Sequence, residues 1–201
     1  STLTNVTIVD NKGVGDAGLG VYNKSGTVNV NNSIIWGNKL SGNDANTSGG
    51  ITFKHSLVEG VTNQDGDGNL DSFLPESKPL FVGEQPGFDP SVADYYSLAL
   101  NSQGIDDGSN ALYTPYALTA PTDLFGNARI YDEANAGVID MGAYELNNIY
   151  VIYHSNFNTD VTFTSRYERE TTTVVVSSYE ATALPARDGY TFLFWTTEAS
   201  G

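Results

Sequence analysis

Three short blocks of the sequence repeat one pattern, and this repeat constrains the fold more strongly than any other feature of the chain. Each block centres on a polar residue, Asn5, Asn32 or His55, so the spacings are 27 and 23 residues. An apolar residue stands two places before each polar residue, and β-branched or aliphatic residues follow it. One coil of this length cannot bury its own apolar side chains, whereas stacked coils bury a continuous interior. The repeat therefore predicts a parallel β-helix.

This prediction depends on one packing arrangement, in which the three blocks form superposed layers around a shared interior. Asn suits the corners of such layers, because a stacked amide can donate and accept along the axis of the coils. The alternative is an antiparallel β-sandwich in which the Asn spacing is a coincidence, and the three matched blocks favour the coils. The residues expected to share the interior are 6, 8, 33, 35, 56 and 58.

The composition agrees with a mostly β chain and limits the partners that it can have. The 21 glycines supply tight turns, and no apolar run approaches the ~18 residues of a membrane-spanning helix. The absence of cysteine excludes disulfides and thiolate metal sites. The net charge of −15 repels phosphate backbones, so we expect no nucleic-acid partner, and nothing in the composition calls for a cofactor.

The regular period fades between about residues 62 and 147, where Gly, Asp and Pro punctuate scattered strands. An open final coil exposes strand edges and apolar side chains that invite aggregation. We therefore expect this segment to form one or two last coils and a C-terminal cap.

Several distinctive runs lie along the first part of the chain: Asn32–Asn38, Gly68–Asp71, Pro79–Val82, Asp94–Leu98, Gly104–Gly108, Asp123–Arg129 and Ile139–Glu145. In their order and spacing they resemble the C-terminal end of the secreted pectate-lyase-like β-helix proteins of gut bacteria. The resemblance covers about residues 1–146, and Ile139–Glu145 is its most specific run. It implies a right-handed parallel β-helix with a C-terminal cap, and a secreted or cell-surface location.

Residues 148–201 differ in composition and are expected to form a second, small β module. Their strands are dense in β-branched and aromatic residues. Arg187–Trp195 resembles the Listeria–Bacteroides repeat, the internalin-type B repeat, which implies a β-grasp-like fold and a spacer role. Phe194 departs from the family pattern, which prefers Gly before the Trp, and we expect the module to be incomplete at Gly201.

One acidic loop imitates a calcium site. Oxygen-bearing residues alternate along it, and Gly68 occupies the sixth place, where calcium loops turn sharply. The twelfth place, however, is Leu74 instead of a bidentate Glu, so a solvated turn is the preferred interpretation. The calcium hypothesis names Asn63, Asp65, Asp67, Asn69 and Asp71 as ligands.

The sequence contains few candidate catalytic residues. A lyase needs a base, and Lys54 and His55 are the candidates, yet His55 occupies the structural place of Asn5 and Asn32. A glycosidase needs two facing carboxylates, whereas the adjacent Asp106 and Asp107 would point to opposite faces of a strand.

Four aromatic residues provide a second binding hypothesis. Tyr22 and Trp36, together with Tyr95 and Tyr96, could form a stacking platform for glycans. The alternative, which we prefer, is that these rings fill the core and the cap.

These observations predict a non-catalytic structural or adhesive segment of a secreted or cell-surface bacterial protein. Its partners would be host or dietary glycans or cell-surface proteins. The alternatives are a carbohydrate-active β-helix, either a polysaccharide lyase or a glycosidase remnant, and a glycan-binding module.

The acidic loop yields a first testable prediction. If Asn63–Asp71 is a solvated turn, millimolar calcium leaves the melting temperature unchanged, because a ligand stabilises only a fold that binds it. The measurement is thermal unfolding with and without calcium. A calcium-dependent rise that disappears in Asp65→Asn would contradict the turn and support the calcium hypothesis.

Overall fold

The computed structural model describes residues 1–14, 20–62, 67–74, 76–85, 88, 95–114, 122–132, 136–154 and 162–169. These residues form many short strands and almost no helix, which confirms the prediction of an all-β chain. The strands are β1 (Thr2–Thr4), β2 (Thr7–Val9), β3 (Lys12–Gly13), β4 (Val21–Tyr22), β5 (Val28–Asn31), β6 (Ile34–Trp36), β7 (Lys39–Leu40), β8 (Asn43–Asp44), β9 (Thr47–Ser48), β10 (Ile51–Lys54), β11 (Leu57–Val58), β12 (Asn148–His154) and β13 (Thr162–Glu168). Between β11 and β12 lie the 3₁₀ turn η1 (Val82–Glu84) and the short helix α1 (Asn110–Tyr113).

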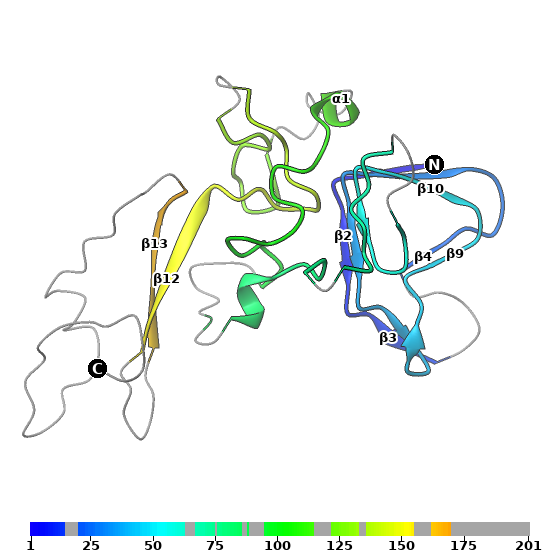
Figure 1. Cartoon of the computed structure of the whole chain (residues 1–201), viewed down its shortest axis with the longest axis horizontal. Coiled ribbons are helices and arrows are strands. Elements are labelled where there is room, and N and C mark those ends of the chain that lie inside the picture. The colour runs from blue at the N-terminus through cyan, green and yellow to red at the C-terminus, as the bar shows by residue number, and fades with distance from the viewer. Residues whose placement is uncertain are drawn as a thin grey trace, which may run out of the picture.

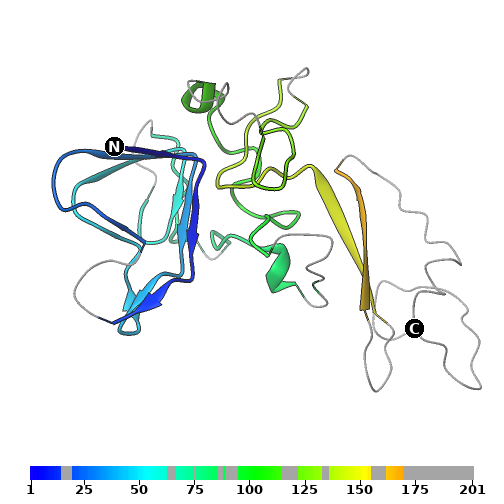
Figure 2. The ribbon, with the colours of Figure 1, turned by 180° about the vertical axis from the view of Figure 1, so that it is seen from behind.

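The three sequence blocks lie side by side as parallel strands (Figures 1 and 2). In the sheet β1–β5–β10, Leu3 and Phe53 both pair with Val30. In the sheet β2–β6–β11, Ile8 and Val58 both pair with Ile35. Two further parallel pairs, β3–β7 and β4–β9, belong to what we call the strand stack, the described residues between 1 and 72, in which β8 pairs antiparallel with β7. The sheets among the described residues are small, and none of them closes on itself.

The chain turns at the same two points in each block. Asn5, Asn32 and His55 have φ angles of 53°, 46° and 46° between the first and second strands of their blocks. Asp10, Gly37 and Gly60 follow the second strand, with φ angles of 55°, 70° and 87°. This left-handed conformation is open to glycine and tolerated by Asn and Asp, which explains the residue types at most of these corners.

Buried polar side chains link the layers behind the first corner. The backbone N–H of Val6 donates to Ser33 Oγ (3.2 Å), and the N–H of Ser33 donates to Ser56 Oγ (3.1 Å). The N–H of Ser56 then donates to Asn69 Oδ1 (3.1 Å). These side chains replace strand carbonyls as acceptors, so buried N–H groups are satisfied where the chain bends.

The inner face of the sheet β2–β6–β11 forms one apolar cluster. Ile35 and Val58 are fully buried in it with Val30, and Ile8 packs against it. The expectation that residues 8, 35 and 58 share an interior is confirmed. Residues 33 and 56 are buried as well, as members of the serine series.

The outer face of the same sheet is also buried. Ile34 and Leu57 pack with Phe81, Leu98 and Met141, which belong to the segment that we call the lateral layer, the described residues between 76 and 146. This segment lies along the side of the strand stack, next to β2 in both views (Figures 1 and 2). Residues 67–72 continue the stack, through bonds such as Leu70 N to Ser56 O (3.1 Å), and the C-terminal cap expected from the sequence stays a prediction.

The described part of residues 148–201 is an antiparallel pair of strands, β12 and β13, paired from Asn148↔Glu168 to His154↔Thr162. The segment Arg187–Trp195, which carries the resemblance to the Listeria–Bacteroides repeat, lies outside the described residues. Among the described residues, no helix has the length and apolar character needed to cross a membrane.

The double-faced burial of β6 is testable by paired truncations. Ile34 is 1% exposed and Ile35 is 0% exposed, on opposite faces of one strand. We expect Ile34→Ala and Ile35→Ala each to lower the free energy of unfolding by about 2–5 kcal/mol, because each removes buried methylenes and leaves a cavity. Denaturant unfolding measures both, with Val14→Ala as the control, since Val14 is 90% exposed. A neutral Ile34→Ala would contradict burial of the outer face.

Candidate functional site

The corner residues of the strand stack bind the lateral layer. Asn32 donates from Nδ2 to Ser109 O (3.0 Å) and accepts at Oδ1 from Ser109 N (2.9 Å), so its amide mimics a strand partner. Asn5 Nδ2 donates to Asp140 O (3.1 Å). His55 Nδ1 lies 3.5 Å from Asp107 O. The corner side chains therefore reach sideways, where we had expected the amides to stack on one another.

Two further contacts close the interface between the strand stack and the lateral layer. Gly142 N donates to Asn32 O (2.8 Å), and Ala143 N donates to Thr7 Oγ1 (2.9 Å). A Cβ atom at Gly142 would lie 2.6 Å from Thr7 Oγ1 and 3.1 Å from Ile34 Cδ1. Only glycine allows this approach, and its φ of 91° favours glycine too.

Three acidic side chains are buried in the lateral layer: Asp123, Asp140 and Glu145. Asp140 accepts the N–H of Asp106 at Oδ1 (2.8 Å) and the N–H of Leu146 at Oδ2 (2.6 Å). Both of its carboxylate oxygens thus accept backbone N–H groups that have no partner in a neighbouring strand.

Glu145 is engaged in the same way. It accepts the N–H of Tyr131 at Oε1 (3.0 Å) and the N–H of Asp140 at Oε2 (3.0 Å). Its own N–H donates to Asp123 Oδ2 (2.9 Å), so the three acids form one connected network.

Asp123 shapes a tight turn. Its Oδ1 accepts the N–H groups of Phe125 (2.9 Å) and Asn127 (2.8 Å), and its own N–H donates to Asn127 O (2.8 Å). A side chain that binds the backbone two residues later is a standard device for fixing a turn. Leu124 and Phe125 are held on the outside of it, 75% and 41% exposed.

Arg129 is the cation buried beside these acids, with 4% of its surface exposed. Its Nη2 donates to the carbonyl oxygens of Gly142 (3.1 Å) and Asp140 (3.4 Å). Burial lowers the pKa of its guanidinium, while the charges of Glu145, Asp123 and Asp140 oppose that shift. One positive charge thus faces three carboxyl groups.

This environment changes the proton affinity of two of the acids. Burial raises the pKa of Asp140 to about 6, against the opposing effect of its backbone hydrogen bonds. Burial, together with the charge of Asp140, raises the pKa of Glu145 to about 8. Such shifts occur at catalytic sites and at structural networks alike, so the geometry must decide between them.

The geometry favours a structural network. The carboxylate oxygens of Asp140 and Glu145 point into the protein and accept backbone N–H groups. Asp106 and Asp107, the adjacent acids considered for a glycosidase, have separate partners. Asp106 forms an ion pair with Arg169, and Asp107 Oδ2 accepts the N–H of Gly104 (3.2 Å).

The structure bears on part of the calcium hypothesis. Asn63 and Asp65 lie outside the described residues. Asn69 is buried, with Oδ1 bound to Ser56 N and Nδ2 donating to Phe53 O (2.9 Å). Asp71 Oδ1 accepts the N–H of Phe73 (3.0 Å), and Asp67 O accepts the N–H of His55 (2.9 Å). Within the described ranges, no group of three or more His, Asp or Glu side chains is placed to hold a metal ion.

Trp36 and Tyr22 of the glycan hypothesis lie on different sheets, and Tyr95 and Tyr96 lie outside the strands. Trp36 is half-buried against the outer cluster, next to Val9 in the sheet register. Tyr22 lies on β4 and is 53% exposed. Tyr95 and Tyr96 meet edge to face with their centroids 4.8 Å apart, which is not the coplanar arrangement of a stacking platform.

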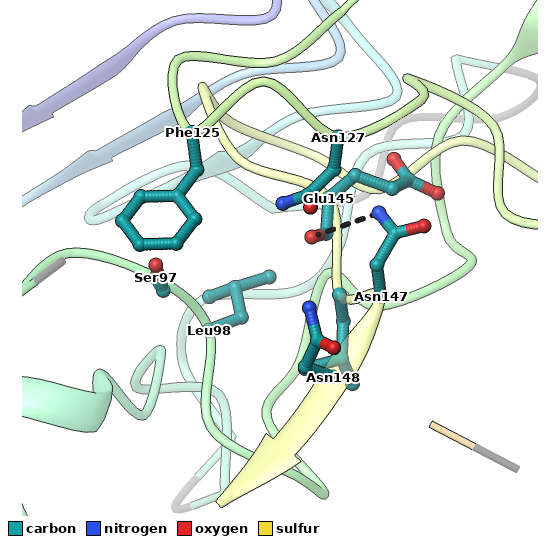
Figure 3. Close-up of a pocket in the computed structure, with 8 residues that line it drawn as sticks. Ser97, Leu98, Phe125, Asn127, Glu145, Asn147 and Asn148 are labelled. Carbon is teal, nitrogen blue, oxygen red and sulfur yellow. Dashed lines mark hydrogen bonds between the residues drawn. The ribbon is translucent and has the colours of Figure 1, made fainter. Parts of the chain in front are cut away.

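The structure instead shows a small hollow where the lateral layer meets β12 (Figure 3). Its cavity volume is about 10 Å³, which is room for about one water molecule. Sequence reasoning missed this site, although Asp123–Arg129 was recognised as a distinctive run. The lining residues are Ser97, Leu98, Phe125, Asn127, Glu145, Leu146, Asn147 and Asn148.

Comparison of the chain with protein-family models, with curated proteins and with solved structures gave no match.

The buried acids predict an unusual pH dependence. The folded chain holds a proton on Glu145 up to about pH 8, whereas the unfolded chain releases it near 4.5. The folded state therefore binds more protons between these values, and the free energy of unfolding falls as the pH rises through them.

We expect Glu145→Gln to flatten this slope, since glutamine does not titrate. Denaturant unfolding at several pH values between 5 and 8 measures it for both proteins. Glu76→Gln is the matched control, because Glu76 is exposed. An unchanged slope in Glu145→Gln would show that this carboxyl does not take up the proton.

Proposed function

We propose that this chain is a non-catalytic structural segment of a secreted or cell-surface bacterial protein. In this proposal residues 1–147 are the last coils and cap of a right-handed parallel β-helix, and residues 148–201 begin a β-grasp-like spacer module. The observation that carries the proposal is the parallel, in-register stacking of three blocks at spacings of 27 and 23 residues.

The strand geometry supports the β-helix over the sandwich. Antiparallel sandwiches join neighbouring strands by hairpins, whereas β1, β5 and β10 are parallel neighbours separated by other strands of the chain. Left-handed corners recur at both bends of each block, as expected where a coil repeats one path. The serine series behind the first corner adds a side-chain repeat with the same spacings.

The use of the charged groups supports a structural role. A catalytic acid or base must lie within hydrogen-bond reach of its substrate. Asp140 and Glu145 are the acids with raised pKa values, and both point inward to backbone N–H groups. The carboxyl groups of Asp140 and Glu145 therefore serve to hold the irregular lateral layer against the strand stack.

The contacts around Arg169 support a spacer role for the second module. Its guanidinium pairs with Asp106, donates to Leu146 O (3.4 Å), and lies 5.2 Å from the centroid of the Tyr131 ring. Arg169 N also donates to Asn147 O (3.1 Å). A cation held by an acid, a ring and a carbonyl restrains the start of the module relative to the lateral layer.

Antibody labelling of intact cells that produce the full-length protein tests the location. We expect an antibody raised against residues 1–147 to label these cells without permeabilisation, because the proposal places this part outside the cell. Labelling that requires permeabilisation, with no protein in the medium, would overturn the proposal.

Enzyme assays on the purified chain test the structural role separately. Polygalacturonate and neutral polysaccharides are incubated with the chain, and unsaturated products and new reducing ends are measured. We expect neither. Release of products that stops in His55→Ala would replace the proposal with a carbohydrate-active β-helix.

A further inference from the structure

Arg169 attaches the strand pair β12–β13 to the lateral layer. In both views this pair lies on the side of the lateral layer away from the strand stack (Figures 1 and 2). Arg169 directly follows β13, and its Nη1 and Nη2 both donate to the carboxylate of Asp106, a two-pronged contact that fixes direction as well as distance. Its Nη1 also donates to Leu146 O (3.4 Å).

One buried carboxyl group lies behind both of these contacts. Asp140, whose surface is 0% exposed, accepts the N–H of Asp106 at Oδ1 (2.8 Å) and the N–H of Leu146 at Oδ2 (2.6 Å). The residue that pairs with Arg169 through its side chain and the residue that accepts from it through its carbonyl are therefore both positioned by Asp140.

The charges packed around Asp140 come from several segments of the lateral layer and from the residue after β13. In this cluster two guanidinium groups face four carboxyl groups, so the uptake of a proton by one carboxyl group relieves repulsion between the acids. The ionisable groups around Asp140 are Asp106, Tyr113, Asp123, Arg129, Glu145 and Arg169.

The charge of Asp140 changes within an ordinary range of pH. Burial raises the pKa of Asp140 to about 6, and the charge of Arg169 is among the effects that oppose this shift. Burial, followed by the charge of Asp140, raises the pKa of Glu145 to about 8. Glu145 therefore keeps its proton while Asp140 titrates.

The proton and Arg169 oppose each other at Asp140. Because the charge of Arg169 lowers the pKa of Asp140, detachment of Arg169 raises this pKa further. The attached state thus binds fewer protons than the detached state, and the attachment weakens as the pH falls through about 6. The proton also occupies one of the two oxygens that accept backbone N–H groups, which weakens the support of Asp106 or Leu146.

We propose that Arg169 is an acid-sensitive latch, which holds the β12–β13 pair in one orientation while Asp140 is charged and releases it when Asp140 takes up a proton. The contact geometry carries this proposal, since a fully buried carboxyl group binds the two residues that bind Arg169. The latch does not depend on the structural role proposed above, so each can fail alone.

Release of the latch differs from unfolding in its direction. The free energy of unfolding rises as the pH falls from about 8, because the folded chain holds the proton on Glu145 more tightly than the unfolded chain does. The latch weakens over the same range of pH. A looser strand pair in a fold that has become more stable therefore identifies the latch.

Distance measurements between two spin labels test the proposal on the whole chain. The chain contains no cysteine, so Leu124→Cys, at a position that is 75% exposed, and Thr162→Cys, at the start of β13, create two unique labelling sites. Double electron–electron resonance measures the distribution of distances between the labels. We expect a narrow distribution at pH 7.5 and one about twice as wide at pH 5.0, because parts of a chain joined by few contacts move relative to each other.

Two variants and a matched control assign the effect. Arg169→Gln removes the charge of the latch and is expected to give the wide distribution at both pH values. Asp140→Asn keeps the shape of the side chain but cannot titrate, so its distribution is expected to be the same at both pH values. Lys78→Gln removes another ion pair of the lateral layer, with Glu84, and is expected to keep the wild-type response.

Thermal unfolding at both pH values confirms that each labelled protein is folded, and Arg169→Gln decides the outcome if Asp140→Asn does not fold. The latch is wrong if the wild-type distribution has the same width at both pH values, if Arg169→Gln stays narrow at pH 7.5, or if folded Asp140→Asn keeps the wild-type response. A wider distribution at pH 5.0 together with a lower melting temperature would also overturn the proposal, since the whole fold would then be loosening.

Discussion

The burial of both faces of the sheet β2–β6–β11 is the constraint on which the rest of the structure depends. Successive side chains of a strand point to opposite faces, so the consecutive apolar pair Ile34 and Ile35 cannot both face the interior of the strand stack. Ile35 joins the inner cluster, and Ile34 needs a second layer to cover it. Phe81, Leu98 and Met141 provide that cover. The lateral layer is therefore part of the core.

A layer built mostly from turns raises a problem that the buried acids solve. Buried backbone N–H groups need acceptors, and the lateral layer contains few strand carbonyls to supply them. Asp123, Asp140 and Glu145 together accept seven backbone N–H groups. The cost of this solution is the burial of carboxyl groups close together, which raises the pKa values of Asp140 and Glu145. The raised pKa values of Asp140 and Glu145 are therefore a consequence of using buried carboxyl groups as acceptors for backbone N–H groups.

The spacing of the sequence blocks was sufficient to predict the register of the strand stack, because side-chain alternation and block length fix which residues become neighbours. The lateral layer could not be predicted in this way. Its contacts join residues far apart in sequence, such as Asn32 with Ser109, 77 positions away, and Asn5 with Asp140, 135 positions away. No period relates these partners. One local signal was present all the same: Ile34–Ile35, followed by Trp36, is too apolar for a strand with one solvated face.

Asp106 connects the two parts of the described structure. Its N–H donates to the buried Asp140 at 2.8 Å, while its carboxylate pairs with Arg169, which follows β13. The buried Asp140 thus fixes the backbone of Asp106, and the carboxylate of Asp106 binds Arg169 at the surface. Because Arg169 also binds Leu146 O, next to the backbone that Asp140 holds, a disturbance of Asp140 would loosen two of the contacts that hold Arg169. The orientation of the β12–β13 pair therefore depends on the same buried carboxylates that satisfy the lateral layer.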